Sequence, residues 1–143
     1  MRVLVINGPN LNLLGIRRPD VYGATTLAEL EDRCRRWGAA LDIEVETFQS
    51  NHEGAIVDRL HDAIGRFDGI VINPGALTHY AYSLHDAIEA IAIPTVEVHL
   101  TDIGAREPWR KTSVVAAVCT ATIGGEGPEG YRRALTLLAG RDD

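Results

Sequence analysis

Strand-like and helix-like patterns of apolar residues alternate along the whole chain, and this alternation limits the folds that are open to it. Short apolar runs predict strands at residues 2–6, 43–48, 69–72, 95–98 and 114–123. Apolar side chains spaced three or four residues apart predict helices at about 27–40, 53–66 and 80–92, with another beginning at 128. Such alternation is typical of a parallel sheet with helices on both faces.

The polarity of the predicted strands indicates their order in the sheet. Residues 69–72 are wholly apolar, as expected of a central strand, whereas Glu44 and Glu46 give the strand at 43–48 a polar face that suits an edge. Right-handed crossovers leave few ways to connect five parallel strands. We therefore predict an α/β fold with a flavodoxin-like, doubly wound sheet of order 2-1-3-4-5 in a three-layer sandwich. The chain of 143 residues is expected to form one such domain over residues 1–143.

Composition and charge narrow the classes of partner. A net charge of −6 and a pI near 5.3 argue against nucleic acid and anionic membranes, while arginines in predicted loops leave room for a small anionic substrate. No apolar run is long enough to span a membrane and no signal peptide is visible, so we expect a cytoplasmic protein. Cys34, on a helix, and Cys119, in the last strand, are expected to be core thiols. The tail at 141–143 is expected to be frayed.

A long polar loop follows the first predicted strand, at about residues 11–23, and loops of this length inside domains are often active-site lids. It carries Arg17 and Tyr22. A nearby cation stabilises a phenolate, so this pair can supply a base near neutral pH. The alternative is a solvated arginine and a surface tyrosine, and spacing alone does not separate the two interpretations.

Polar residues also follow the other strands of the predicted sheet. In sheets of this order a ligand binds beyond the carboxyl ends of the strands, at the switch point between the first and third strands. Asn73 follows the third strand, in a sequence that predicts either a simple turn or an anchor for a hydroxyl or carboxylate. Thr78 and His79 begin a helix, as an ordinary N-cap or as an anion site. His99 ends the fourth strand, as a core histidine or as a general acid.

Charged residues in the remaining loops and helices also allow two interpretations. Arg106 and Arg110 are spaced to bind a carboxylate, or belong to a salt-bridged surface loop. Asp86 is either functional or part of a solvated helix face. The single lysine, Lys111, weakens a Schiff-base mechanism. The sequence lacks a P-loop, a dinucleotide fingerprint, a metal-binding histidine pair and a nucleophile elbow, which argues against those classes and against a flavin-binding flavodoxin.

Four stretches of the chain together resemble the type II 3-dehydroquinate dehydratases, and the resemblance covers essentially the whole length. The stretches are residues 6–15 (INGPNLNLLG), 48–54 (FQSNHEG), 73–79 (NPGALTH) and 96–100 (VEVHL). The resemblance implies a lyase that converts 3-dehydroquinate to 3-dehydroshikimate through an enolate, without metal or cofactor. Such an enzyme serves the shikimate pathway of aromatic amino acid biosynthesis or quinate catabolism. The resemblance also implies a homo-oligomer, typically a dodecamer built from trimers.

The resemblance assigns roles to individual residues by motif. Tyr22 is similar to the base that removes the proton next to the ketone, and Arg17 to the lid cation that stabilises its phenolate. Asn10 is similar to the residue that positions a water at the enolate oxygen, and His99 to the acid that protonates the departing hydroxyl. Asp86 corresponds to a residue that reaches in from a neighbouring subunit. The positions that hold the substrate hydroxyls and carboxylate correspond to Asn73, His79, Leu100, Thr101 and Arg110.

The chain departs from the family pattern around the expected site. The departures are Arg18 for Glu, His85 for Arg, Thr101 for Ser, Asp102 for Asn, Gly104 for His, Pro108 for Glu and Trp109 for Phe. The expected chemical residues remain, so the same reaction is expected. Two alternatives stay open: a dehydratase that acts on a close analogue such as an aminodehydroquinate, and a non-catalytic module that binds a carboxylate.

Overall fold

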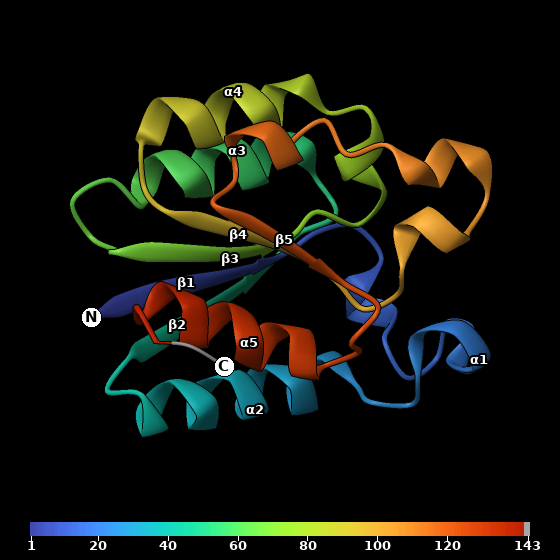
Figure 1. The fold of residues 1–143 in the computed structure, drawn as a ribbon, viewed down its shortest axis with the longest axis horizontal. Coiled ribbons are helices and arrows are strands. Elements are labelled where there is room, and N and C mark those ends of the chain that lie inside the picture. The colour runs from blue at the N-terminus through green and yellow to red at the C-terminus, as the bar shows by residue number, and fades with distance from the viewer. Residues whose placement is uncertain (142–143) are drawn as a thin grey trace.

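Five parallel strands form one sheet in the computed structural model, which describes residues 1–141 (Figure 1). Their bounds are β1 (Arg2–Asn7), β2 (Glu44–Gln49), β3 (Gly69–Asn73), β4 (Thr95–His99) and β5 (Ala121–Gly124). The strand order is β2-β1-β3-β4-β5, so the predicted topology and fold class are confirmed. β3 and β4 are buried along their whole length, whereas β2 at the edge is partly exposed. Asp142 and Asp143, in the tail predicted to be frayed, lie outside the described residues.

Within residues 1–141, four long helices cover the two faces of the sheet (Figure 1). The pair on one face is α2 (Leu27–Ala40) and α5 (Glu129–Leu138), and the pair on the other is α3 (Glu53–Asp62) and α4 (Tyr82–Ile91). Successive side chains of a strand point to opposite faces, so β1 supplies Val3 and Val5 to one core and Leu4 and Ile6 to the other. The predicted three-layer arrangement is therefore present.

Short helices occupy the loops at the carboxyl ends of the strands. The segment at 11–23 contains η1 (Leu11–Leu13) and α1 (Pro19–Tyr22), and β3 is followed by η2 (Gly75–His79). The chain after β4 contains η3 (Ile103–Ala105), η4 (Pro108–Lys111) and η5 (Ala116–Val118). In Figure 1, α1 and the excursion that carries η3 and η4 project on the same side of the molecule. These loops surround the edge of the sheet at which a ligand was expected.

Helix boundaries match the predictions to within a few residues. Thr26 caps α2, because its side chain accepts a hydrogen bond from the Glu29 N–H at 3.2 Å. α3 ends at Asp62, before the predicted end at 66, and α4 begins at Tyr82 rather than at 80 because η2 occupies the preceding residues. No helix within residues 1–141 is long and apolar enough to cross a membrane.

The predicted start of the fifth strand is wrong. The prediction places it at residue 114, but β5 begins at Ala121. The residues before it form an irregular segment in which Val115 is fully buried and the Val114 N–H donates to the Thr78 carbonyl at 2.7 Å. Most of these side chains are apolar although Val115 is the one buried residue among 114–120, so the apolar pattern did not distinguish this irregular segment from a strand.

The two cysteines occupy different environments. Cys34 is buried on α2, as predicted, whereas Cys119 is only half-buried and ends η5 instead of lying in a strand. Burial raises the pKa of each thiol to about 12. Both therefore remain protonated at neutral pH, which makes them poor nucleophiles.

The loops after β1 and β3 meet backbone to backbone, and this contact requires glycine. A Cβ atom at Gly8 would lie 2.6 Å from the Pro74 carbonyl oxygen. The Gly8 N–H donates to the Asn73 carbonyl at 2.8 Å. Gly75 has a φ of +61°, a conformation that side chains disfavour. These contacts hold the two loops together where the central strands end.

Candidate active site

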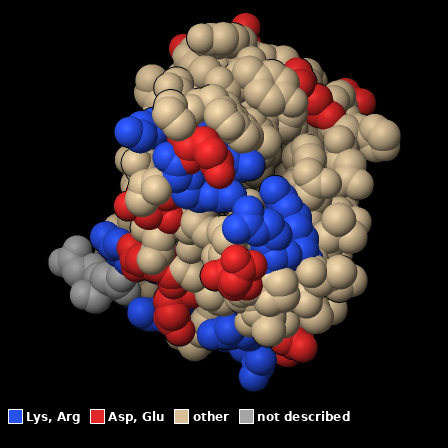
Figure 2. Space-filling model, turned by 90° about the vertical axis from the view of Figure 1, so that its right-hand side faces the viewer, with Lys and Arg blue, Asp and Glu red and all other residues tan. Residues whose placement is uncertain are grey.

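A pocket opens at the carboxyl ends of β1, β3 and β4, at the edge where the sequence predicts a ligand site. Nine predicted site residues line it: Asn10, Arg17, Tyr22, Asn73, His79, His99, Leu100, Thr101 and Arg110. Strand ends supply one wall, and the loops at 11–23 and 101–112 supply the other. Figure 2 shows positive side chains gathered across the middle of this face of the molecule. Arg17, Arg106 and Arg110 are the arginines that line the pocket.

Asp86 is the predicted site residue that does not line the pocket of its own chain. It lies on α4, its side chain is 81% exposed, and it contacts His85 Nδ1 at 3.1 Å. The structure thus leaves this carboxylate free to approach another molecule. Its contribution to the site of a neighbouring subunit stays a prediction.

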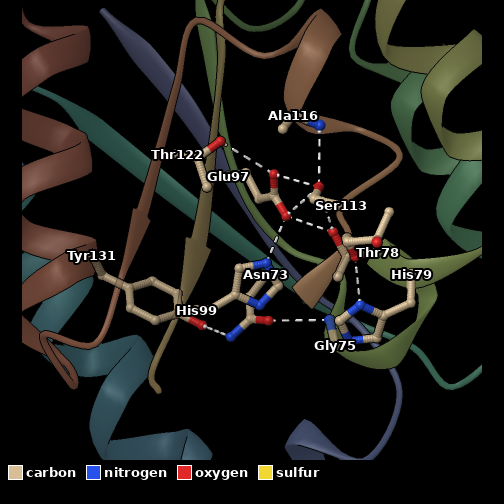
Figure 3. A network of polar contacts seen from close by, with 11 residues as sticks. Asn73, Gly75, Thr78, His79, Glu97, His99, Ser113, Ala116, Thr122 and Tyr131 are labelled. Carbon is tan, nitrogen blue, oxygen red and sulfur yellow. Dashed lines mark hydrogen bonds and ion pairs between the residues drawn. The ribbon is translucent and has the colours of Figure 1, made fainter. Parts of the chain in front are cut away.

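His99, the last residue of β4, is held by a buried carboxylate (Figure 3). Its Nε2 lies 2.6 Å from Glu97 Oε2, and Glu97 has no exposed surface. An ionised carboxylate only accepts hydrogen bonds, so Nε2 carries a hydrogen and donates it. Nδ1 is therefore the ring nitrogen of His99 that remains for the pocket.

Hydroxyl groups complete the surroundings of Glu97 (Figure 3). Ser113 Oγ lies 2.9 Å from both carboxylate oxygens, the Thr78 hydroxyl donates to Oε2, and Thr122 donates to Oε1 at 3.3 Å. Burial is the strongest single influence and by itself raises the pKa of Glu97. The hydrogen bonds from His99 and the hydroxyls, with the charge of His99, outweigh burial, and the pKa lies below its ordinary value of 4.5. The carboxylate is thus ionised at neutral pH and fixes the imidazole ring.

Tyr22, at the end of α1, lies between two arginines. Arg106 Nη1 donates to the Tyr22 hydroxyl at 2.8 Å, and Arg17 Cζ lies over the ring, 4.6 Å from its centroid. The sequence pairs Tyr22 with Arg17 in its own loop and groups Arg106 with Arg110 as carboxylate ligands. In the structure the direct contact to the phenol oxygen comes from Arg106, which is 84 residues away along the chain.

His79 and Arg110 meet around Trp109. His79 Nδ1 lies 2.6 Å from the Thr112 carbonyl, which can only accept, so Nδ1 carries the hydrogen and Nε2 is the other ring nitrogen available to a ligand. Trp109 packs edge-on against His79 with centroids 5.3 Å apart. Arg110 Cζ lies 4.0 Å from the Trp109 centroid, and Arg110 Nε donates to Glu107. These contacts orient the His79 ring and the Arg110 guanidinium at the pocket wall.

Two asparagines complete the pocket at the ends of β1 and β3. Asn73 Oδ1 accepts from the Gly75 N–H at 3.1 Å, and its Nδ2 donates to the buried Tyr131 hydroxyl at 2.9 Å (Figure 3). Asn10 has a φ of +69°, a left-handed conformation that asparagine tolerates. Its N–H donates to Asn51 Oδ1 at 2.9 Å. The neighbouring loops therefore fix the backbone of Asn10 and the side chain of Asn73.

The sequence reasoning missed Glu97, Ser113 and Tyr131. A signal for Glu97 was present, because it is the one charged residue in an otherwise apolar strand segment and lies two residues before His99, on the same strand face. Ser113 and Tyr131 carried no comparable signal. Each reaches the site from a segment distant in sequence, through the packing of the irregular segment before β5 and of α5.

The pocket suits proton transfer on an anionic ligand. It places a phenol beside two guanidinium groups and a histidine beside an ionised carboxylate, the combination expected of a base and an acid. The lining arginines supply local positive charge on a chain with a net charge of −6. Among residues 1–141, no group of three or more His, Cys, Asp or Glu side chains is arranged to hold a metal ion.

Comparison with known proteins gives consistent results for sequence and fold. The family model described as dehydroquinase class II matches residues 1–139. The 3-dehydroquinate dehydratases of Bacillus cereus (strain AH820) and Bacillus anthracis are each 53% identical over 137 residues, which cover 96% of this chain and 94% of theirs. The crystal structure of type II dehydroquinase from Butyrivibrio crossotus has a TM-score of 0.95 and 46% identity, covering 96% of this chain and 97% of that one.

A second crystal structure, of type II dehydroquinase from Propionibacterium acnes, has a TM-score of 0.94 and 42% identity, covering 97% of this chain and 96% of that one. Both structural matches and both sequence matches extend over nearly the whole length of each partner. The resemblance found in the four sequence stretches is therefore confirmed, and the chain belongs to the class II dehydroquinase family.

Proposed function

We propose that this protein is a 3-dehydroquinate dehydratase that removes water from 3-dehydroquinate through an enolate, with no metal or organic cofactor. One observation carries the proposal. A single pocket holds Tyr22, hydrogen-bonded by Arg106, together with His99, hydrogen-bonded to the buried carboxylate of Glu97. A dehydration next to a ketone needs one group to take a proton from carbon and another to protonate the leaving hydroxyl. Family membership supports the same reaction.

In the first step, the Tyr22 phenolate removes the proton α to the ketone. The C–H bond breaks, and its electron pair is delocalised into the enolate. Arg106 and Arg17 favour the phenolate form through their charge. Asn10 positions a water that donates to the enolate oxygen and stabilises the developing negative charge.

In the second step, the enolate re-forms the ketone, the carbon–carbon double bond forms, and the bond to the hydroxyl breaks. His99 gives the departing oxygen a proton, so the hydroxyl leaves as water. Its Nε2–H is engaged by Glu97, and Nδ1 is thus the nitrogen that delivers the proton. The ionised Glu97 favours the imidazolium before the transfer. Tyr22 then loses its acquired proton to solvent and His99 gains one, which restores the starting forms.

Substrate binding requires contacts to one carboxylate and to several hydroxyl groups. The residues that provide them are Asn73, His79, Leu100, Thr101 and Arg110, all of which line the pocket. Asp86 reaches the site of a neighbouring subunit, which its 81% exposed side chain permits. This contribution requires a homo-oligomer, and we expect a dodecamer built from trimers.

The direct test is an absorbance assay with purified protein and 3-dehydroquinate, because the enone product absorbs in the ultraviolet and the substrate does not. Tyr22→Phe should lower kcat by about 10³-fold, within the range of a lost general base. Tyr82→Phe is the matched control, because Tyr82 is 68% exposed on α4 and does not line the pocket.

Each alternative has its own outcome in this assay. Unchanged turnover by Tyr22→Phe would remove Tyr22 as the base. Saturable binding without turnover would identify a non-catalytic carboxylate-binding module. A higher kcat/KM for aminodehydroquinate would identify a dehydratase of that analogue. Rescue of an aromatic auxotroph that lacks its own dehydroquinase would place the protein in biosynthesis, and rescue of growth on quinate would place it in catabolism.

A further inference from the structure

We infer that Tyr131, on α5, is a positioning residue that fixes the orientation of the Asn73 side chain for substrate binding. The inference rests on the proposed function, in which Asn73 contacts the substrate. Tyr131 itself does not line the pocket and is fully buried. Its hydroxyl is hydrogen-bonded to the side chains of Asn73 and Asn7, the last residues of the paired strands β3 and β1, and Figure 3 shows the contact with Asn73.

The contacts form a chain from the pocket loop to β1. Asn7 and Asn73 are register partners at the ends of the paired strands β1 and β3. Tyr131 bridges their side chains: Asn73 Nδ2 lies 2.9 Å and Asn7 Oδ1 lies 2.6 Å from its hydroxyl oxygen. The Gly75 N–H donates to Asn73 Oδ1 at 3.1 Å. The Asn73 amide is therefore held at both of its ends.

The direction of each hydrogen bond in this chain is determined. A backbone N–H can only donate, so the atom of Asn73 next to Gly75 must be its oxygen and the atom next to Tyr131 its nitrogen. The Tyr131 oxygen accepts from Asn73, and its single hydrogen goes to Asn7 Oδ1. The Asn73 side chain therefore cannot turn over without breaking both bonds. It presents its second Nδ2–H in one fixed direction.

Burial keeps Tyr131 in the form that this role requires. Burial, as the main cause, strongly raises the pKa of Tyr131, although the hydrogen bond from Asn73 acts in the opposite direction. The hydroxyl is therefore a neutral donor and acceptor throughout the working pH range. The ring packs with Val98 and Leu135 in an apolar core, so Tyr131→Phe removes the hydroxyl and retains the packing.

Asn7 indicates that this arrangement serves more than stability. It is fully buried, and its Nδ2 has no hydrogen-bond partner among residues 1–141. A buried donor without a partner costs free energy, and an apolar residue at the end of β1 would avoid that cost. Asn7 instead supplies the acceptor that orients the Tyr131 hydroxyl.

The test is a double-mutant cycle between Tyr131→Phe and Asn73→Ala, read as kcat and KM for 3-dehydroquinate. We expect Tyr131→Phe to raise KM about tenfold, as for the loss of one hydrogen bond, with little change in kcat because the contact is made in both ground and transition states. Asn73→Ala should raise KM at least as much. In the Asn73→Ala background, Tyr131→Phe should change KM less than about twofold, because its target is gone.

Leu135→Ala is the control for a purely structural effect, because Leu135 lies on the same helix and in the same core and is fully buried. It should lower the melting temperature without changing KM. If Tyr131→Phe does not fold, Asn7→Ala tests the same chain of contacts and should also raise KM. A wild-type KM in the folded variants, or equal effects of Tyr131→Phe in both backgrounds, would overturn the inference. If the wild type binds 3-dehydroquinate without turnover, the proposed function fails, and the same cycle is read as binding by calorimetry.

Discussion

The two walls of the pocket are built in different ways. The wall that carries His99 is a strand end, where His99 is 5% exposed and Glu97 is completely buried among hydrogen-bond donors. The wall that carries Tyr22 is made of loops and short helices. The polar contacts of Tyr22 are one hydrogen bond from Arg106 to its hydroxyl and the guanidinium of Arg17 over its ring.

This difference separates the two halves of the chemistry. A buried, hydrogen-bonded charge is expensive to disturb, so the acid is arranged before the substrate arrives. Contacts between partly exposed loop residues are weaker and rearrange quickly. We therefore expect the base to reach its working position only when the loops close over the substrate.

Glu97→Gln tests the wall that carries His99 (the rigid wall), and it should have the largest effect among the variants of residues that support the acid and the base. The neutral amide removes the charge that favours the protonated form of His99, and kcat should fall by about 100-fold, as for an impaired general acid. The measurement is kcat at saturating 3-dehydroquinate near neutral pH. Glu44→Gln, at a 75% exposed position on β2, is the control and should behave as wild type. A wild-type kcat for Glu97→Gln would show that the buried carboxylate does not assist the acid.

Arg106→Gln and Arg17→Gln compare the two cations of the wall that carries Tyr22 (the loop wall). Arg106 contacts the phenol oxygen at 2.8 Å, whereas Arg17 lies over the ring. Arg106→Gln should lower kcat by about 30-fold and Arg17→Gln by about fivefold, because a charge acts most strongly on the atom it contacts. The surface variant Arg36→Gln is the control, since Arg36 is 70% exposed. A larger loss of kcat in Arg17→Gln than in Arg106→Gln would show that Arg17 is the main cation that supports Tyr22.

Acid should destabilise the fold by protonating Glu97, the buried carboxylate of the rigid wall. The pKa of Glu97 is lower in the folded state than its ordinary value of 4.5, so its stabilising effect is complete above that value and is lost as the pH falls through the folded pKa. The free energy of unfolding of the wild type should exceed that of Glu97→Gln by about 1–3 kcal/mol near pH 7. This difference should shrink below about pH 4.5. Urea unfolding at several pH values measures this.

Glu107, an exposed carboxylate on the loop wall, should not contribute to the acid dependence of stability. Arg110 lowers the pKa of Glu107, but that carboxylate is exposed and solvent screens the pair. Glu107→Gln should therefore leave the acid dependence of stability unchanged. If Glu107→Gln alters this dependence as much as Glu97→Gln does, burial is not what separates the two walls.

Salt should have the smallest effect and should act on the loop wall alone. The pocket arginines attract an anionic substrate, and raising the salt from about 50 mM to about 500 mM should increase KM by about threefold through screening. The catalytic constant should stay constant, because the Glu97–His99 pair is shielded from solvent. A parallel loss of kcat would indicate that salt also reaches the acid.

The sequence was sufficient to predict the sheet and the location of the site. β1 and β3 contain continuous apolar runs, and Glu97 is the one charged residue in β4. The strand order follows from the polarity of β2 and from the handedness of the crossovers. Once that order is known, Asn73 and His99 must end adjacent strands at the same edge. The start of β5 could not be predicted, because residues 114–120 carry a strand-like apolar pattern although they lie outside any strand and Val115 is the one buried residue among them.

The partners of individual side chains were the part that sequence reasoning could not supply. The Arg106–Tyr22 contact joins residues 84 positions apart, and the Tyr131–Asn73 contact joins residues 58 positions apart. Both depend on how a loop or a helix docks against the sheet, which no local spacing describes. Glu97 is the exception, since its position two residues before His99 in a strand puts both side chains on one face.

The excursion between β4 and the segment before β5 is fastened at both ends. The Leu100 carbonyl accepts from the Gly127 N–H at 3.0 Å, and the Thr112 carbonyl accepts from His79. The stretch between these anchors carries Arg106 and Arg110 but contributes nothing to the hydrogen bonds around Glu97. Libraries randomised within this stretch, with Arg106 retained for the base, should therefore change substrate preference toward new carbon acids while the Glu97–His99 pair stays intact.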